Sequence, residues 1–383
     1  MRIAWKSIRR TTHALAGAWR HWRWRHDAML YEVTPRCNLR CSHCYNVWKD
    51  DVGYDGESEL PTARAIELIE KAARESRCRQ FTFTGGEPCL RDDLEALVKA
   101  ARHAGSRRND GVRHVALITN GTLLTAERVK SLAAAGVDLF ELPLNSGDRR
   151  RHDAMAGVEG CFDKVTRAAA EIGAIGARVA FVFVGTRVNI GDWPDVLKLG
   201  FALGAGSFLF NRYNAGGAAH KRPEALLPSV GQVREGLAAA SAFAEKHGVG
   251  IGASIAIPPC LIDPKEFPKV GFGFCAAGTA RAYYTLDPMG NVRPCNHTPT
   301  VLGNLFEAPL WRIVANNSRL AAFMEARPAF CAGCRLEREC QGGCKAAAEA
   351  CCGDLRACEP FLAANLDHAR PLQSNDSRTT RST

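Results

Sequence analysis

The sequence has 383 residues, of which 46% are hydrophobic and 23% charged, values typical of folded globular proteins that exclude a wholly disordered chain. It has no run of about 20 uninterrupted apolar residues, and residues 1–26 lack the apolar core of a secretory signal, so we expect a cytoplasmic protein. The 16 cysteines and the formal net charge of +10 are unusual, and in a reducing compartment so many thiols favour metal binding or redox chemistry over disulfides.

The N-terminal segment, residues 1–27, carries most of the positive charge. Residues 1–26 hold seven Lys and Arg and no Asp or Glu, which leaves the body of the chain near neutral and argues against a nucleic-acid partner. Mostly apolar side chains recur there at spacings of three and four, which predicts an amphipathic helix: Trp5, Ile8, Thr12, Leu15, Trp19 and Trp22. Such an arm would contact a partner or a membrane surface, or would pack on the protein's own body.

Residues 28–215 alternate short apolar runs with amphipathic stretches. Strands are expected at residues 29–33, 81–83, 115–118, 139–144, 179–184 and 207–210. Helices are expected between them at residues 61–77, 90–104, 126–135, 162–172 and 193–203. Repeated strand–helix units predict an α/β fold with a parallel sheet, either open or closed into a barrel. In such folds the functional residues lie at the carboxyl ends of the strands.

The pattern changes after residue 215. Residues 216–271 contain a Gly- and Pro-rich loop and a predicted helix at 233–247, and we interpret them as a bridge. Residues 272–361 are dense in cysteine and poor in periodic pattern, which indicates a second domain whose core is inorganic rather than hydrophobic. Residues 362–383 end in a polar, aperiodic stretch and are interpreted as a disordered tail.

Three cysteines follow the first predicted strand with the spacing C-x3-C-x2-C: Cys37, Cys41 and Cys44. Three thiolates on one tight loop can hold three irons of a [4Fe–4S] cluster and leave the fourth iron open for a substrate or cofactor. The alternative is a structural zinc loop with a distant fourth ligand. The position of the loop, at the end of the first strand of a β/α array, favours the cluster.

These residues resemble the radical SAM superfamily, whose enzymes cleave S-adenosylmethionine reductively. The matching stretches are residues 34–45, which include the three cysteines, and Gly85-Gly86-Glu87-Pro88 at the end of the next predicted strand. The resemblance implies a partial (β/α)6 radical SAM barrel. It also implies that the open iron binds the amino and carboxylate groups of S-adenosylmethionine, whose amino group contacts the Gly-Gly-Glu-Pro strand end. Glycines at such a site allow close backbone approach.

The resemblance implies further cofactor contacts at the ends of later strands. Thr119 and Asn120 end the third strand, and Asn145 and Ser146 end the fourth, where relatives commonly carry an aspartate in place of Asn145. Arg212, after the sixth strand, is a candidate for a carboxylate or ribose contact, and a surface arginine is the alternative.

Seven cysteines near the C-terminus have an order and spacing that resemble the SPASM extension of many radical SAM enzymes, which carries auxiliary [4Fe–4S] clusters. The resemblance implies one cluster on Cys275, Cys295 and Cys344. It implies a second cluster on Cys331, Cys334, Cys340 and Cys358. The alternative is a pair of zinc sites.

Two points of ligation stay open. Arg281 stands where some relatives have a cysteine, so the first auxiliary cluster has an open iron, a non-cysteine ligand or Cys260 as its fourth ligand. Cys351 or Cys352 could compete with Cys358 in the second, and spacing favours Cys358.

The resemblance also implies a reaction. An external one-electron donor such as flavodoxin or ferredoxin reduces the first cluster, and the resulting 5′-deoxyadenosyl radical abstracts hydrogen from a substrate. The leading hypothesis is a ribosomally made peptide or protein undergoing maturation. One alternative is cofactor biosynthesis on a small molecule such as a tetrapyrrole. The other is a non-catalytic iron–sulfur electron carrier, which would need no open iron. The general base stays open among several carboxylates and Tyr213.

Overall fold

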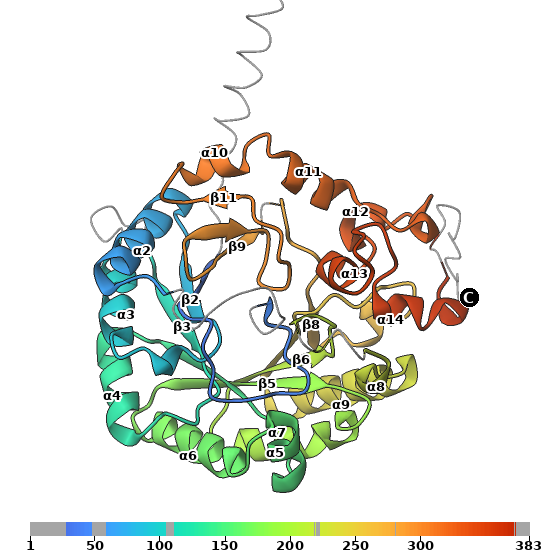
Figure 1. The fold of residues 1–383 in the computed structure, drawn as a ribbon. Helices are drawn as coiled ribbons and strands as arrows, with labels where there is room; N and C mark the ends of the chain where they lie inside the picture. Colours follow the sequence, from blue (N-terminus) through green and yellow to red (C-terminus); the bar gives the residue numbers. More distant parts are fainter. Residues whose placement is uncertain are drawn as a thin grey trace, which may run out of the picture.

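One curved sheet of 11 strands runs through the part of the chain that this computed structural model describes, residues 28–47, 59–104, 111–217, 219, 223–279, 281–370 and 372. The strands are ordered β11-β10-β9-β1-β2-β3-β4-β5-β6-β7-β8. In this order, all neighbouring strands from β9 through β1 to β8 are parallel to each other. Strand β10 is antiparallel to both of its neighbours, β9 and β11. Figure 1 shows this sheet curling around a central space, with a ring of helices outside it.

The six predicted strands are present with closely similar limits: β1 (Ala28–Glu32), β2 (Gln80–Thr84), β3 (His114–Ile118), β4 (Leu139–Pro143), β5 (Arg178–Gly185) and β6 (Ser207–Arg212). The predicted helices lie between them: α2 (Thr62–Ser76), α3 (Leu94–His103), α4 (Ala126–Ala135), α6 (Cys161–Ala174) and α7 (Trp193–Ala202). The α/β partial barrel is therefore confirmed.

Two local elements differ from the prediction. The helix expected from residue 90 begins at Leu94, because residues 88–90 form a separate 3-10 turn, η2 (Pro88–Leu90), whose first free amide bonds to the Glu87 side chain. Helix α5 (Arg149–Ala156) was not expected at all. Its sequence, RRRHDAMA, has too few apolar residues for a periodic pattern, and the Asp148 side chain caps it by accepting a hydrogen bond from Arg151 N.

The sheet extends beyond the predicted barrel on both edges. The segment interpreted as a bridge contains α8 (Pro223–Leu226) and α9 (Val230–His247), and it also adds β7 (Gly250–Ala253) and β8 (Val270–Phe272). The cysteine-rich segment contributes β9 (Tyr283–Leu286), β10 (Asn291–Arg293) and β11 (Gly303–Asn304), of which β9 pairs with β1. Strands this short carry too few residues for an alternating pattern in the sequence. The sheet is thus continuous through both segments.

Short helices follow in the cysteine-rich segment: α10 (Leu310–Val314), α11 (Ser318–Glu325), α12 (Glu337–Cys340), α13 (Lys345–Cys352) and α14 (Pro360–Ala363). Further 3-10 turns are η4 (Ile190–Asp192), η6 (Pro264–Glu266), η7 (Ala329–Cys331) and η8 (Leu366–His368). Two buried ion pairs tie this segment to the barrel, Arg293 with Glu32 on β1, and Glu359 with Arg212 on β6.

The two faces of the barrel sheet differ because successive strand residues point to opposite sides. On β4, Phe140 and Leu142 are fully buried among the core residues, whereas Glu141 and Pro143 line the central cavity. On β2, Phe81 and Phe83 belong to the same core, and Thr82 lines the cavity. On these two strands the inner face is more polar than the outer one, whereas Val182 and Val184 on β5 line the cavity with apolar side chains. Such a mixture of apolar walls and a few polar groups is typical of ligand cavities.

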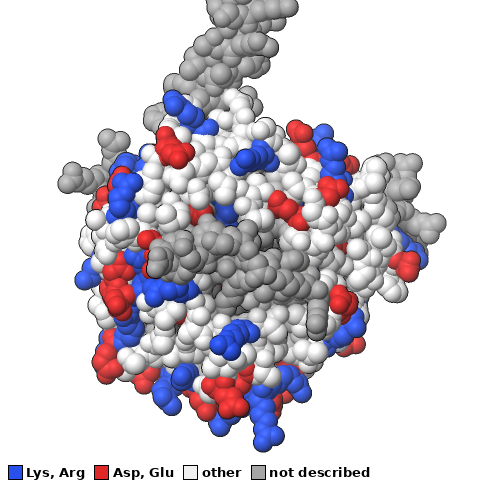
Figure 2. Space-filling view, in the orientation of Figure 1, with Lys and Arg blue, Asp and Glu red and all other residues white. Residues whose placement is uncertain are grey.

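Charges of both signs are mixed over the described residues on the face shown in Figure 2. Within the described ranges, no helix is both long and apolar enough to cross a bilayer. The predicted amphipathic arm, residues 1–27, and residues 371 and 373–383 of the predicted tail lie outside the described residues. The start of that tail is not disordered, because α14 includes the buried Leu362 and η8 follows at Leu366–His368.

Candidate functional site

The three-cysteine loop leaves the carboxyl end of β1. Cys37, Cys41 and Cys44 are partly buried and free of disulfides. The loop is fixed on the end of α5, because Arg40 N donates to Ala156 O at 3.0 Å and Ser42 N donates to Met155 O at 3.0 Å. Three thiols outside any disulfide, on a backbone held in this way, fit an iron–sulfur cluster with three protein ligands.

The two glycines after β2 allow this loop to pack closely against the end of β2. Gly86 N donates to Thr34 O at 2.8 Å, and Gly85 has a φ of +137°. A Cβ at Gly86 would lie 2.0 Å from Arg36 O, and a Cβ at Gly85 would lie 2.5 Å from Thr34 O. The structure thus gives the glycines a reason beyond cofactor contact: they let the cysteine loop pack directly on the end of β2.

We expect Gly86→Ala to cost about 3 kcal/mol of unfolding free energy and to weaken binding of S-adenosylmethionine, because the new Cβ meets the main chain of the cysteine loop. Thermal unfolding and equilibrium dialysis with labelled S-adenosylmethionine measure the two effects. Gly191→Ala is the matched control, since no heavy atom lies within 4 Å of its added Cβ and its φ is not positive. Equal behaviour of the two variants would contradict the packing argument.

The Glu87 side chain forms hydrogen bonds within the protein. Its carboxylate is fully buried and accepts hydrogen bonds from Thr119 Oγ1 at 2.6 Å, Asn120 N at 2.7 Å and Cys89 N at 3.0 Å. Burial raises the pKa of Glu87, while these hydrogen bonds act in the opposite direction. The carboxylate therefore holds the ends of β2 and β3 together, and Thr119 and Asn120 are positioned through it.

Asn145 and Ser146 are also buried, at 3% and 0% exposure. Asn145 Oδ1 accepts a hydrogen bond from Val184 N at 2.9 Å, and its Nδ2 lies 3.4 Å from His43 Nε2 in the cysteine loop. Ser146 Oγ donates to Asp192. The structure gives both side chains partners within the protein, so they support the cysteine loop and the end of β4 from beneath.

The guanidinium of Arg212 is paired with groups of the protein itself. It is fully buried, and its Nη2 donates to Glu359 Oε1 at 2.6 Å and to Ala256 O at 2.7 Å. Its Nη1 donates to Tyr213 O at 3.2 Å, and the group lies 4.5 Å from the centre of the Phe361 ring. The carboxylate that Arg212 contacts is thus Glu359 of the protein itself, which joins β6 to α14. The surface alternative is therefore wrong, whereas the cofactor contact stays a prediction, since Arg212 also lines the cavity described below.

A cavity of about 540 Å³ runs along the inside of the barrel, from Ala28 and Gln80 at the amino ends of β1 and β2 to the carboxyl ends of the strands beside the cysteine loop. Of the residues expected to contact the cofactor, these line it: Gly85, Gly86, Thr119, Asn120 and Arg212. Four others lie outside its lining: Glu87, Pro88, Asn145 and Ser146. The cavity is large enough for a drug-sized ligand, and Cys44 lies on its wall.

Three residues join the cysteine loop to the cysteine-rich segment at this cavity. The rings of Tyr45 and His297 stack with centroids 3.9 Å apart, and Asn296 Nδ2 donates to the Tyr45 hydroxyl at 2.8 Å. Burial lowers the pKa of His297 to about 4, so this imidazole is neutral at physiological pH. None of the three was assigned a role from the sequence. The available signals were the position of Tyr45 at the end of the matching stretch, residues 34–45, and that of Asn296 and His297 immediately after Cys295.

The first auxiliary set of cysteines is brought together as expected. Burial raises the pKa of the Cys295 thiol above its ordinary value, and the neighbouring Cys344 and Cys275 thiols add to that rise. Asn214 Nδ2, from the loop after β6, lies 3.3 Å from Cys344 Sγ. Since Cys295 directly precedes Asn296, this set adjoins the cavity wall.

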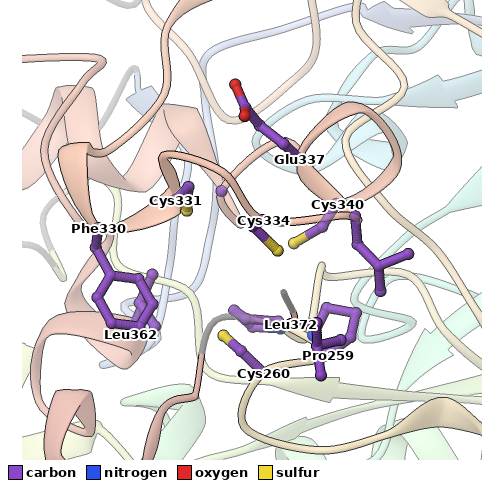
Figure 3. Close-up of a pocket in the computed structure, with 12 residues that line it drawn as sticks. Pro259, Cys260, Phe330, Cys331, Cys334, Glu337, Cys340, Leu362 and Leu372 are labelled. Carbon is purple, nitrogen blue, oxygen red and sulfur yellow. The ribbon is translucent and has the colours of Figure 1, made fainter. Parts of the chain in front are cut away.

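Five cysteines, rather than four, lie around the second auxiliary site. Cys331 has Cys340, Cys334 and Cys358 as neighbours, and their thiols add to the rise that burial causes in the pKa of Cys331, to about 11. Cys260 faces the Cys331, Cys334 and Cys340 thiols across a small cavity (Figure 3). The idea that Cys260 completes the first auxiliary cluster is therefore wrong, because the loop of residues 258–262 places it at the second. No three Cys, His, Asp or Glu side chains in the described ranges lie close enough to hold a single metal ion.

Two segments of the chain match known families. Residues 31–200 match the radical SAM superfamily, and residues 275–341 match SPASM, an iron–sulfur cluster-binding domain. The chain is 30% identical over 354 residues to a PqqA peptide cyclase of Methylocella silvestris, which covers 89% of this chain and 88% of that protein. It is 31% identical over 348 residues to a PqqA peptide cyclase of Ruegeria pomeroyi, with coverage of 89% and 88%.

Solved structures show the same fold at lower identity. Streptococcus suis SuiB bound to the precursor peptide SuiA superposes with a TM-score of 0.68 at 15% identity, covering 89% of this chain and 77% of that one. Native anSMEcpe with bound AdoMet superposes with a TM-score of 0.68 at 18% identity, covering 89% and 95%.

Proposed function

This chain belongs to the radical SAM superfamily and carries a SPASM domain, and from that membership we propose that it is a peptide cyclase that joins two side chains of a ribosomally made peptide. The relatives that support this proposal are named for such a reaction and share nearly the whole length of the chain. The chain is a radical SAM enzyme in any case, and its cofactors are S-adenosylmethionine, one [4Fe–4S] cluster in the barrel and auxiliary clusters in the SPASM domain.

Cys37, Cys41 and Cys44 are the residues that would hold the barrel cluster. When bound there, the cluster supplies the electron that cleaves S-adenosylmethionine into methionine and a 5′-deoxyadenosyl radical, which takes a hydrogen atom from the substrate. Gly85, Gly86, Thr119 and Asn120 are the residues that we propose orient the methionine part, because they line the cavity beside Cys44. The remaining contribution of the protein is to enclose this space and exclude water.

The proposal is supported mainly by the direction in which the cavity extends. It runs from the cysteine loop and the end of β2 to Asn296 and His297, which follow the first auxiliary cysteine set. Joining two side chains removes two hydrogens, so the second must leave as a proton with its electron going to an acceptor. A space that runs from Cys44 to Asn296, the residue after Cys295, would bring a substrate near both cysteine sets.

Glu141 is the residue that we propose receives that proton. It projects from β4 into the cavity, and burial raises its pKa from 4.5 to about 7, so near neutral pH it can both accept and hold a proton. Tyr213, the other candidate, donates its hydroxyl to Ala219 O at 2.6 Å and is fully buried. The cavity geometry therefore favours Glu141.

Glu141→Gln should make stability less sensitive to pH. Because the folded protein holds the Glu141 proton up to about pH 7 and the unfolded chain releases it near 4.5, the parent loses stability as pH rises through that window. Denaturant unfolding should therefore show the variant about 3 kcal/mol more stable than the parent at pH 8 and equal to it at pH 4. Crosslink formation should fall in the same variant.

Glu245→Gln provides the control, because Glu245 is on the surface and 70% exposed. It should change neither the pH dependence of unfolding nor the crosslink. A Glu141→Gln protein with the parent's pH profile and full product formation would remove Glu141 from the mechanism.

The function is tested with a short peptide encoded beside the gene. The anaerobically reconstituted protein, S-adenosylmethionine, dithionite and the peptide should yield a product lighter by two hydrogen atoms, with a fragment pattern that shows a covalent link between two residues. A tetrapyrrole precursor in parallel tests the small-molecule alternative. Formation of 5′-deoxyadenosine without any change in peptides from the gene neighbourhood would contradict the peptide proposal.

Three further assignments complete the proposal. An external one-electron donor of the flavodoxin or ferredoxin type reduces the barrel cluster, and the protein works in the reducing cytoplasm. We keep the domain division at residues 28–215, 216–271 and 272–361, with residues 1–27 as an arm that contacts a partner or a membrane surface. The tail is shortened to residues 371–383, because residues 362–370 contain the end of α14 and η8. Pull-down with a chain lacking residues 1–27 tests the role of the arm.

A further inference from the structure

We propose that Asn214 donates a hydrogen bond to the thiolate sulfur of Cys344 and thereby raises the reduction potential of the first auxiliary cluster. This inference rests on the family membership that underlies the proposed function, and on the expected binding of that cluster by Cys275, Cys295 and Cys344, but not on the peptide substrate. Asn214 is a positioning residue in this proposal, because it acts on the cluster through one of the ligands.

The three cysteines of the first auxiliary set lie in apolar surroundings. They pack against Ala277, Phe323 and Ala346, each of which is at most 4% exposed. Such surroundings shield a bound cluster from water, and in a medium of low polarity one hydrogen bond has a larger electrostatic effect than it has at the surface.

The amide of Asn214 is directed at this set. Its Nδ2 lies 3.3 Å from Cys344 Sγ and 3.3 Å from His297 Nδ1, so the two N–H groups have two acceptors. The residue is 5% exposed, and its Oδ1 is buried without a hydrogen-bond partner among the described residues. An amide turned the other way would point that oxygen at the sulfur, which is unfavourable once Cys344 has lost its proton on binding iron. Binding of the cluster therefore favours the orientation that the structure shows.

The backbone at Asn214 is held on both sides. Tyr213 N donates to Gly185 O at 2.8 Å on β5, and the Tyr213 hydroxyl donates to Ala219 O at 2.6 Å farther along the same loop. A donor on an anchored segment is already in place when the charge of the cluster changes, so little energy is lost in reorganisation.

The expected effect follows from the charge that the cluster gains on reduction. Part of the added electron density lies on the thiolate sulfurs, and an N–H donor stabilises it more in the reduced state than in the oxidised state, so hydrogen bonds to these sulfurs raise the potential. A higher potential makes the cluster a better acceptor of the electron that crosslink formation releases, while the proton goes to Glu141 as proposed above.

The test uses the full chain with Cys37, Cys41 and Cys44 changed to alanine, so that the auxiliary clusters alone contribute EPR signals. After anaerobic reconstitution, these signals are followed while dithionite supplies electrons through mediators. Asn214→Leu has a side chain of similar shape and no donor. It should make one of the two auxiliary potentials more negative by about 59 mV, a tenfold change in the equilibrium constant for one-electron reduction, with the parent's iron content. Parent potentials in Asn214→Leu would overturn the proposal.

Asn211→Leu is the matched control, because Asn211 precedes Asn214 by three residues and lines the same cavity. Its Oδ1 accepts hydrogen bonds from Ser254 N at 3.0 Å and from Ser254 Oγ at 2.9 Å, and its side chain bonds to no cysteine in the described ranges. Both auxiliary potentials should stay at the parent values. An equal shift in the two variants would mean that the polarity of the cavity wall is the cause, and the proposal would fail.

A second measurement does not depend on how well Asn214→Leu folds or binds iron. The protein is prepared with ¹⁵N only in the side-chain amides of asparagine, and pulsed EPR of the reduced clusters should show a ¹⁵N coupling. That coupling should persist in Asn296→Gln, which removes the other labelled amide beside this set. No coupling, or a coupling that Asn296→Gln abolishes, would overturn the proposal. Neither experiment contains a substrate, so their outcome is independent of the peptide assay that tests the proposed function.

Discussion

Replacing Cys37, Cys41 and Cys44 together by alanine is expected to abolish cleavage of S-adenosylmethionine and to remove roughly four irons per chain, while the auxiliary iron stays. The reason is structural: the three thiols lie on one loop bonded to the end of α5 and to the end of β2, whereas the auxiliary cysteines lie in the segment from Cys275 onward. Iron and sulfide analysis and chromatography of 5′-deoxyadenosine measure the two effects.

Cys78→Ala is the matched control for this prediction, because Cys78 is fully buried in the main hydrophobic core and belongs to neither cysteine array. It should keep iron content and activity close to those of the parent. If the triple alanine variant retained all its iron, the assignment of the barrel cluster would be wrong, and if it lost all its iron, the two arrays would not bind independently.

The elements that the sequence predicted well are those whose signal is local. The C-x3-C-x2-C spacing fits within one loop, and the Gly-Gly-Glu-Pro stretch has a steric requirement of its own, since a Cβ at Gly86 would meet Arg36 O at 2.0 Å. Strand limits were also predictable because buried parallel strands read as short apolar runs. For the cysteine spacing and the strand limits the cause lies within a few residues of the pattern. The Gly-Gly-Glu-Pro stretch was identified by its resemblance to a family, because its steric partner Arg36 belongs to a different loop.

Residue roles that depend on distant partners could not be predicted. Arg212 is held by Glu359, which is 147 residues away, and Asn145 is held by Val184 N, which is 39 residues away. Both are buried polar groups, which must find hydrogen-bond partners inside the protein, and the sequence does not show which partners. Their positions in the sequence predicted cofactor contacts, and the structure adds that both side chains also support the protein.

The same limitation applies to Cys260. The sequence left it as one of three possibilities for the fourth position of the first auxiliary cluster, because Arg281 stands where some relatives have a cysteine. The turn at Pro258 and Pro259 instead directs it toward Cys331, Cys334 and Cys340, and only the folded chain reveals that direction.

The buried pair of Arg212 and Glu359 gives the second large prediction. Both side chains are at most 1% exposed, and the guanidinium also satisfies Ala256 O, so Arg212→Met leaves a buried carboxylate without its charged partner. We expect a loss of about 3–5 kcal/mol in unfolding free energy, measured by anaerobic denaturant unfolding of the reconstituted protein. Lysine is not an adequate replacement, because its single ammonium cannot reproduce the bonds that the guanidinium makes.

The pH dependence identifies the cause of that loss. Arg212 lowers the pKa of Glu359 against the effect of burial, so without Arg212 that pKa rises further, and lowering the pH should neutralise Glu359 and restore part of the lost stability. The double variant Arg212→Met with Glu359→Leu should likewise recover most of it, since no buried charge remains. A double variant as unstable as the sum of the two single ones would mean that the pair matters through its shape and packing rather than through its charges. In that case the link between β6 and α14, and with it the position of the backbone at Cys358, would depend on the Phe361 contact instead.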